Sequence, residues 1–217
     1  MVAATESCEF CAELHDTRDS RFGMMYGDVV ASRVVSETSS FVVVPTIGQM
    51  FAGSMLVIPR RHVETLAGFG NLNELTSLLR SLNAALSRFG DVISFEHGAR
   101  STTGGSCGIY HAHLHCVPTP RAVSSEELLP RGEVVADLAE GMRILSDASQ
   151  YLIVHDSSGV TRYLDLSFGG GREYGSQYFR RRIAQVLDAP VEWDWRKYTV
   201  PETFLLDTVA AFRSSAA

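Results

Sequence analysis

His111, His113 and His115 alternate along one short stretch of the sequence, separated by Ala and Leu and followed by Cys and Val. Residues at i, i+2 and i+4 of an extended strand project from the same face. The three imidazoles are therefore expected to lie side by side, with the residues between them facing a core. Neutral imidazole is a common zinc ligand and can also act as a nucleophile. The pattern predicts either a metal site or a phosphate-handling site.

The segment before these histidines, residues 98–108, favours the second of the two sites. It is rich in Gly, Ser and Thr, with glycines at positions 98, 104, 105 and 108. Such a loop lets successive backbone N–H groups approach an anion closely, whereas a metal site gains little from it. A flexible connection would have the same composition.

Cys8 and Cys11 form a Cys-x-x-Cys pair near the start of the chain. Four cysteines in all are too few for a disulfide scaffold, so metal binding explains this pair better than a disulfide does. The pair is half of a tetrahedral site and needs two further ligands. Two thiols without a metal are the alternative.

Short strands and one helix are expected to position these groups. Four strands are predicted, over residues 40–45, 54–59, 91–96 and 109–117. Apolar residues at three- and four-residue spacing predict a helix over 71–89, with Gly90 just past its end. The polar segment 15–30 is expected to form a loop.

The chain after residue 120 is expected to form an appended α+β unit. It consists of a helix over 133–145, a hairpin of 151–155 with 160–166, and a second helix over 176–187. Arg180 and Arg181 lie near the start of that second helix, where guanidinium groups could clamp a polyphosphate. A solvated charged face is the alternative reading.

Composition excludes several classes of protein. The 217 residues fit one compact domain with an added subdomain, and the formal charge of −6 argues against bulk nucleic-acid binding. The longest apolar stretches reach about five residues, far short of the roughly 20 that a membrane helix needs. The acidic N-terminus does not resemble a secretory signal, so a cytoplasmic protein is expected.

The histidine stretch resembles the His-x-His-x-His-x-x signature of the histidine-triad (HIT) superfamily of nucleotidyl hydrolases and transferases. Residues 56–62, Leu-Val-Ile-Pro-Arg-Arg-His, look like the family's strand that ends in Pro, two basic residues and His. The predicted helix and the glycine-rich loop follow in the family's order. The resemblance covers roughly residues 8–120.

The resemblance implies an α+β fold, with a HIT-like antiparallel sheet and one main helix. Residues 1–120 would form the catalytic domain, and residues 121–217 a C-terminal α+β extension packed on it. HIT domains are commonly dimers, so a homodimer is implied unless the extension covers the interface. The implied partner is a small-molecule nucleotide, with no nucleic acid or membrane involved.

The implied activity is that of a nucleotide hydrolase or nucleotidyltransferase acting at the α-phosphate. His113, the middle histidine, would attack phosphorus and form a covalent nucleotidyl-histidine, and His115 would stabilise the phosphate oxygens. A histidine with a pKa near 6.5 is largely neutral at pH 7, so a ring nitrogen is free to attack. A zinc-dependent hydrolase that uses the three histidines as ligands, and a non-catalytic nucleotide-binding protein, remain as alternatives.

The resemblance also suggests the remaining site residues. Glu96 stands where family hydrolases usually carry Asn or Gln, and a carboxylate beside phosphate must be protonated or paired. The other expected phosphate-binding residues are Gly105, Ser106, Cys107, Gly108, Arg180 and Arg181. The expected structural zinc ligands are Cys8, Cys11, His62 and His111, an arrangement in which His111 is not catalytic.

Overall fold

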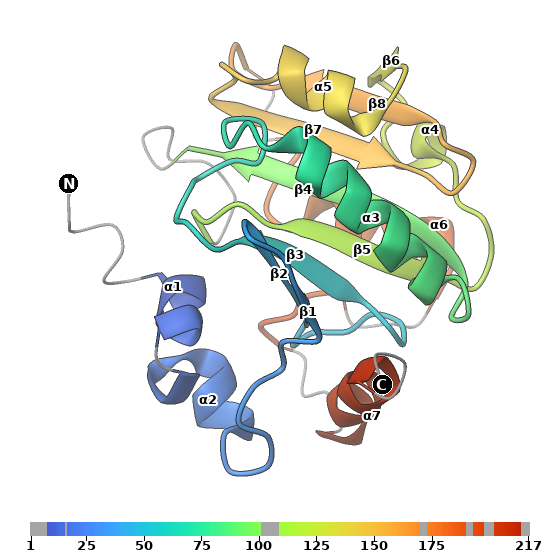
Figure 1. Ribbon diagram of the computed structural model, residues 1–217. Helices are drawn as coiled ribbons and strands as arrows, with labels where there is room; N and C mark the ends of the chain where they lie inside the picture. Colours follow the sequence, from blue (N-terminus) through green and yellow to red (C-terminus); the bar gives the residue numbers. More distant parts are fainter. Residues whose placement is uncertain are drawn as a thin grey trace.

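The computed structural model describes residues 8–15, 17–100, 109–169, 173–189, 193–197 and 202–213. Within these residues, one antiparallel sheet of eight strands has the order β1-β2-β3-β5-β4-β7-β8-β6 (Figure 1). The strands are β1 Ser36–Glu37, β2 Phe41–Pro45, β3 Met55–Pro59, β4 Asp91–Ala99, β5 Leu114–Thr119, β6 Glu133–Val135, β7 Gln150–His155 and β8 Thr161–Asp165. The α+β fold class is confirmed.

Helices lie on both faces and at one end of this sheet (Figure 1). They are α1 Glu9–His15, α2 Arg21–Tyr26, α3 Leu72–Leu86, α4 Ser125–Leu128, α5 Leu138–Ile144, α6 Tyr178–Val186 and α7 Glu202–Arg213, with a 3₁₀ turn at Thr17–Asp19. Figure 1 shows α3 and α5 in front of the sheet and α6 behind it. None of the described helices is long and apolar enough to cross a bilayer.

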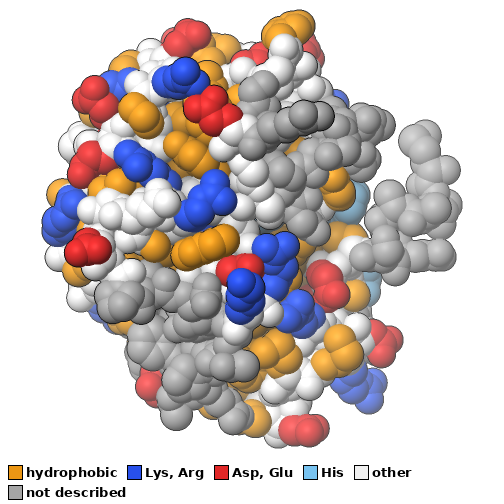
Figure 2. Space-filling model, turned by 180° about the vertical axis from the view of Figure 1, so that it is seen from behind, with side chains coloured by type: hydrophobic (Ala, Val, Ile, Leu, Met, Phe, Trp, Pro, Cys, Tyr) orange, Lys and Arg blue, Asp and Glu red, His pale blue; other side chains and the backbone are white. Residues whose placement is uncertain are grey.

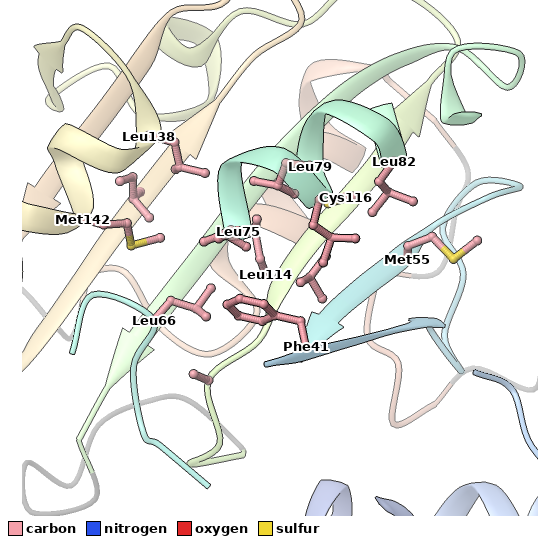
Figure 3. Packing of buried hydrophobic residues seen from close by; sticks show 14 of the residues in the cluster. Phe41, Met55, Leu66, Leu75, Leu79, Leu82, Leu114, Cys116, Leu138 and Met142 are labelled. Atoms are coloured by element: carbon pink, nitrogen blue, oxygen red, sulfur yellow. The ribbon is translucent and has the colours of Figure 1, made fainter. Parts of the chain in front are cut away.

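The main helix, α3, forms where the apolar spacing predicts it. Its buried residues Leu75, Leu79 and Leu82 follow one another at helical intervals and face the sheet, where they meet Leu114 and Cys116 of β5 (Figure 3). Burial of one leucine side chain is worth about 1.5–3 kcal/mol, so this stripe is enough to hold the helix on the sheet. The carboxylate of Glu74 in the first turn also accepts hydrogen bonds from the Ser40 backbone and hydroxyl.

Several segments differ from the structure that the sequence predicts; the strand expected over residues 109–117, for example, begins only at Leu114. Residues 21–26, expected to be a loop, form α2, because Ser20 caps the helix and Phe22 and Tyr26 bury the same face of it. The predicted helix over 133–145 begins only at Leu138, after the cap residue Asp137. Glu133–Val135 instead forms β6, since β8 offers it a hydrogen-bonding partner.

The segment after residue 120 continues the sheet of the first segment. β7 pairs with β4 over six residues, from Ser94 opposite His155 to Ala99 opposite Gln150. The predicted hairpin is present as β7 and β8. The expected domain boundary at residue 120 therefore falls within one continuous sheet, and α6 packs over the face opposite α3.

Candidate functional site

Four side chains from three distant parts of the chain meet at one end of the sheet. Cys8 and Cys11 flank the start of α1, His62 follows β3, and His111 precedes β5; their ligand atoms all lie within 4.8 Å of one another. Cys8 Sγ is 3.4 Å from His111 Nδ1, and Cys11 Sγ is 3.3 Å from His62 Nδ1. Among the described residues, no other group of three or more His, Cys, Asp or Glu side chains is gathered in this way.

The hydrogen bond of His111 leaves its other ring nitrogen available as a metal ligand. His111 Nε2 donates to the backbone carbonyl of Pro59 at 2.9 Å, which leaves the lone pair of Nδ1 facing the two thiols. Burial lowers the pKa of His111 to about 4, so the imidazole is neutral at pH 7 and able to act as a ligand. Burial, and then Cys8, raise the pKa of Cys11 to about 12, and a bound cation would reverse that shift. Two thiolates with two neutral imidazoles are a donor set compatible with zinc.

His113 is turned away from this cluster and toward a pocket. Its Nδ1–H donates to the carbonyl of His111 at 2.7 Å, so Nε2 carries the free lone pair. Burial lowers the pKa of His113, which keeps the ring neutral. His111 thus faces the two cysteines, whereas His113 faces the pocket.

His115 lies beside His113 on the same face of the sheet. It is opposite Phe95 of β4, whose ring stacks on it at 4.7 Å between centroids, and its own ring meets His113 edge-on at 5.2 Å. Burial first, and the nearby His113 and Arg180 next, hold the pKa of His115 well below its usual range. Within the described part of the chain, Nδ1 of His115 has no hydrogen-bond partner.

The pocket in front of the two histidines has a volume of about 120 Å³. Its floor is the sheet, and its walls come from α1, α2, α6 and the segment around Trp195. The residues that shape it include Phe10, Arg33, Phe95, Phe179, Arg180 and Trp195. Seen from the α6 side, the outer surface carries Lys and Arg side chains interspersed with Asp and Glu (Figure 2).

The side chains of the two arginines predicted to clamp phosphate point in different directions from α6. Arg180 is buried, lines the pocket, and donates from Nε to the carbonyl of Trp193 at 2.6 Å. The guanidinium of Arg181 instead lies over the ring of Trp193, 5.8 Å from its centroid, and does not line the pocket. Adjacent helical residues point about 100° apart, so only one of the two can face the histidines.

Glu96 lies on the other face of the sheet, away from the pocket in which it was expected to bind phosphate. Its neighbours Phe95 and His97 line the pocket, so strand alternation points Glu96 toward α3. There its carboxylate accepts hydrogen bonds from the backbone N–H of Leu66 at 3.0 Å and from the hydroxyl of Tyr151. Burial raises the pKa of Glu96 to about 8. The remaining predicted phosphate ligands, Gly105, Ser106, Cys107 and Gly108, lie outside the described residues.

The structure adds pocket residues that the sequence pattern did not single out. Arg33 is buried and binds both carboxylate oxygens of Glu13, which fastens α1 to the sheet. Phe10 stands between the two cysteines and lines the pocket beside His113. Its place inside the Cys-Glu-Phe-Cys motif was a usable signal, whereas nothing in the local sequence marks Arg33.

No family model and no curated protein matches the chain. A zinc-bound histidine triad family protein from Mycobacterium smegmatis is similar at 21% identity and a TM-score of 0.39, over 65% of this chain and 92% of that one. A hypothetical histidine triad nucleotide-binding protein from Sulfolobus tokodaii shares 22% identity at a TM-score of 0.36, over 52% and 68%. A HIT family hydrolase from Clostridium thermocellum shares 16% identity at 0.36, over 52% and 91%.

Proposed function

We propose that this protein is a nucleotide hydrolase or nucleotidyltransferase that acts at the α-phosphate of a nucleoside phosphate through His113. The observation that carries the proposal is the hydrogen bond from His113 Nδ1 to the carbonyl of His111. It directs the free lone pair of Nε2 into a pocket that also holds His115 and Arg180. A positioned, neutral imidazole is what attack on phosphorus requires.

In the first step, His113 Nε2 forms a bond to the α-phosphorus as the bond from phosphorus to the leaving oxygen breaks. The nucleotide is then held as a phosphoramidate on the histidine, and the leaving group departs with the electron pair of that bond. Water or a second acceptor next attacks the same phosphorus, and the P–N bond breaks to restore the free imidazole. His115 and Arg180, which line the same pocket, would stabilise charge on the phosphate oxygens.

The backbone of the glycine-rich loop is proposed to complete the phosphate site. Gly105, Ser106, Cys107 and Gly108 precede the histidine stretch directly in the sequence. Backbone N–H groups of such a loop suit an anion. Arg181 is not part of this proposal, because its guanidinium lies over Trp193.

The cluster of Cys8, Cys11, His62 and His111 is proposed to hold a structural zinc ion. A bound zinc would contribute folding free energy and would tie the N-terminal helix to the histidine segment. The orientation of the histidines argues against the alternative of a zinc hydrolase that uses all three of them. His111 faces the thiols, and the Nδ1 of His113 already donates to a carbonyl.

The test combines an activity panel with chemical trapping. Adenosine and uridine nucleotides are incubated with the protein, with and without inorganic phosphate, and a radiolabelled substrate is quenched in base. The expected result is turnover by wild type and an alkali-stable, acid-labile adduct on His113. His113→Ala should lose several orders of magnitude in kcat with its metal content intact.

His15→Ala serves as the matched control, because His15 is exposed and lies outside the pocket. It should keep its activity and form the adduct. Activity retained by His113→Ala, or activity lost only together with bound metal, would move the zinc-hydrolase alternative ahead. Nucleotide binding by wild type without any turnover would identify a binding protein instead.

A further inference from the structure

The helix that carries the cysteine pair presents two different faces to two different sites. Cys8 and Cys11 point toward His62 and His111. Phe10, between them in sequence, lines the pocket together with Glu13 on the next turn. The short helix α1 is therefore a wall shared by the metal-ligand cluster and the pocket.

Phe10 contacts a histidine of each site. Its ring meets His111 edge-on, with centroids 5.7 Å apart and an interplanar angle of 83°. It meets His113 in a similar way, at 5.4 Å and 69°. Edge-to-face contacts of this kind are a preferred geometry for aromatic rings.

The position of Phe10 is itself closely constrained. The side chain is 5% exposed and packs in a small apolar cluster with Val42, Val44, Leu56 and Ile58 of the sheet. On the same helix, Glu13 is tied to Arg33 by two hydrogen bonds of 2.7 Å. A dense interior of this kind does not deform smoothly, so a shift of α1 must move Phe10 with it.

Two further contacts orient the ring of His113. Nδ1 is held by the carbonyl of His111, and one edge meets His115. A rotation that breaks the Nδ1 bond would also move Nε2 away from the pocket. Misplacement of a reacting atom by about 1 Å can cost 10²-fold in rate.

We infer that Phe10 is a positioning residue that holds the His113 ring in its single orientation and links that orientation to the state of the cysteine and histidine cluster. The consequence for turnover rests on the proposed function. The consequence for ring orientation does not, and it can be measured without any substrate.

The test uses ¹⁵N NMR of the imidazole nitrogens at one fixed pH. The His113 signals are assigned by their loss in His113→Ala. Wild type should show His113 as one tautomer, protonated on Nδ1 as its bond to the His111 carbonyl requires. Phe10→Ala should show averaged tautomers, and Phe10→Leu, which keeps bulk at the position, should partly restore the wild-type spectrum.

Leu14→Ala is the matched control. Leu14 belongs to the same helix and packs against the same apolar cluster, yet it does not line the pocket. It should leave the His113 spectrum unchanged. In kinetics, Phe10→Ala should lower kcat by about 10²-fold and change KM much less, with metal content equal to that of wild type.

The link to the cluster is tested with Cys11→Ala, alone and combined with Phe10→Ala. Cys11→Ala should disturb the His113 spectrum in the wild-type background and add little in the Phe10→Ala background. A His113 spectrum unchanged in both Phe10 variants overturns the inference. Additive effects in the double variant overturn the link to the cluster. Absence of turnover by wild type would overturn the proposed function alone, since the spectra still decide the role of Phe10.

Discussion

Removal of the Glu13 carboxylate is expected to destabilise the folded protein by about 3–5 kcal/mol, the usual cost of leaving one charge of a buried pair without its partner. The Arg33 side chain is 2% exposed and that of Glu13 is 11% exposed. Two hydrogen bonds of 2.7 Å join them, and Arg33 also donates to the carbonyl of Pro45. In Glu13→Ala the guanidinium stays buried beside Phe22, and among the described residues the carbonyl of Pro45 is the acceptor that is left to it.

The pair of Glu37 and Arg60 provides the internal control for this magnitude. These side chains are 64% and 42% exposed, so Glu37→Ala should cost no more than about 1 kcal/mol. A reverse test replaces both members of the buried pair. Glu13→Leu combined with Arg33→Met should be less destabilised than either single variant, since no charge is then left buried.

Urea unfolding followed by circular dichroism measures these differences, with the m-value checked for each variant. A loss of 3–5 kcal/mol corresponds to a Tm lower by roughly 6–20 °C in a domain of this size. Equal costs for Glu13→Ala and Glu37→Ala would show that burial does not strengthen the Glu13 pair. A double variant less stable than both singles would show that the charges themselves are favourable.

Three further outcomes are expected. Purified protein should hold about one zinc per chain, and Cys8→Ala should lose both this metal and thermal stability. Cys116→Ala, which alters the core beneath α3 instead, should keep the metal. Full metal retention in Cys8→Ala would contradict the proposed ligands. Arg180→Ala should raise KM for polyphosphate substrates by about tenfold or more, whereas Arg181→Ala should leave KM unchanged. Equal KM values for the two variants would show that Arg180 does not contact the substrate. Burial raises the pKa of Glu96 from 4.5 to about 8, so the folded state binds this proton more tightly than the unfolded state does. The free energy of unfolding should therefore fall as pH rises from about 4.5 to about 8. The same dependence of stability on pH in Glu96→Gln would refute this assignment.

Several features of the protein could be predicted because they depend on neighbouring residues alone. The leucines of α3 repeat at helical spacing, and the runs that form β2 and β3 are apolar segments ended by proline. The cysteine spacing and the alternating histidines indicate the two sites from the sequence alone. The four proposed zinc ligands do come together in space, from positions up to 103 residues apart.

Other features needed the tertiary structure, since they depend on which element covers a given face. β5 begins only at Leu114, and the segment before it is held by a hydrogen bond from the Ala112 N–H to the carbonyl of Val63. His111 therefore leaves the strand pattern and turns to the cysteines, while His113 faces the pocket. Residues 133–135 likewise form a strand and not a helix, because β8 lies beside them and pairs with their backbone.

The element that covers each face also decides the different surroundings of Arg180 and Arg181, and of Glu96 and its neighbours on β4. A local pattern states that adjacent residues face different directions, but it does not state what each direction contains. α3 covers one face of the sheet, and α1 and α6 close the pocket on the other. The chemistry of each side chain follows from that placement, because burial and nearby charges, set by residues far away in the sequence, decide which groups are neutral, paired or exposed to substrate.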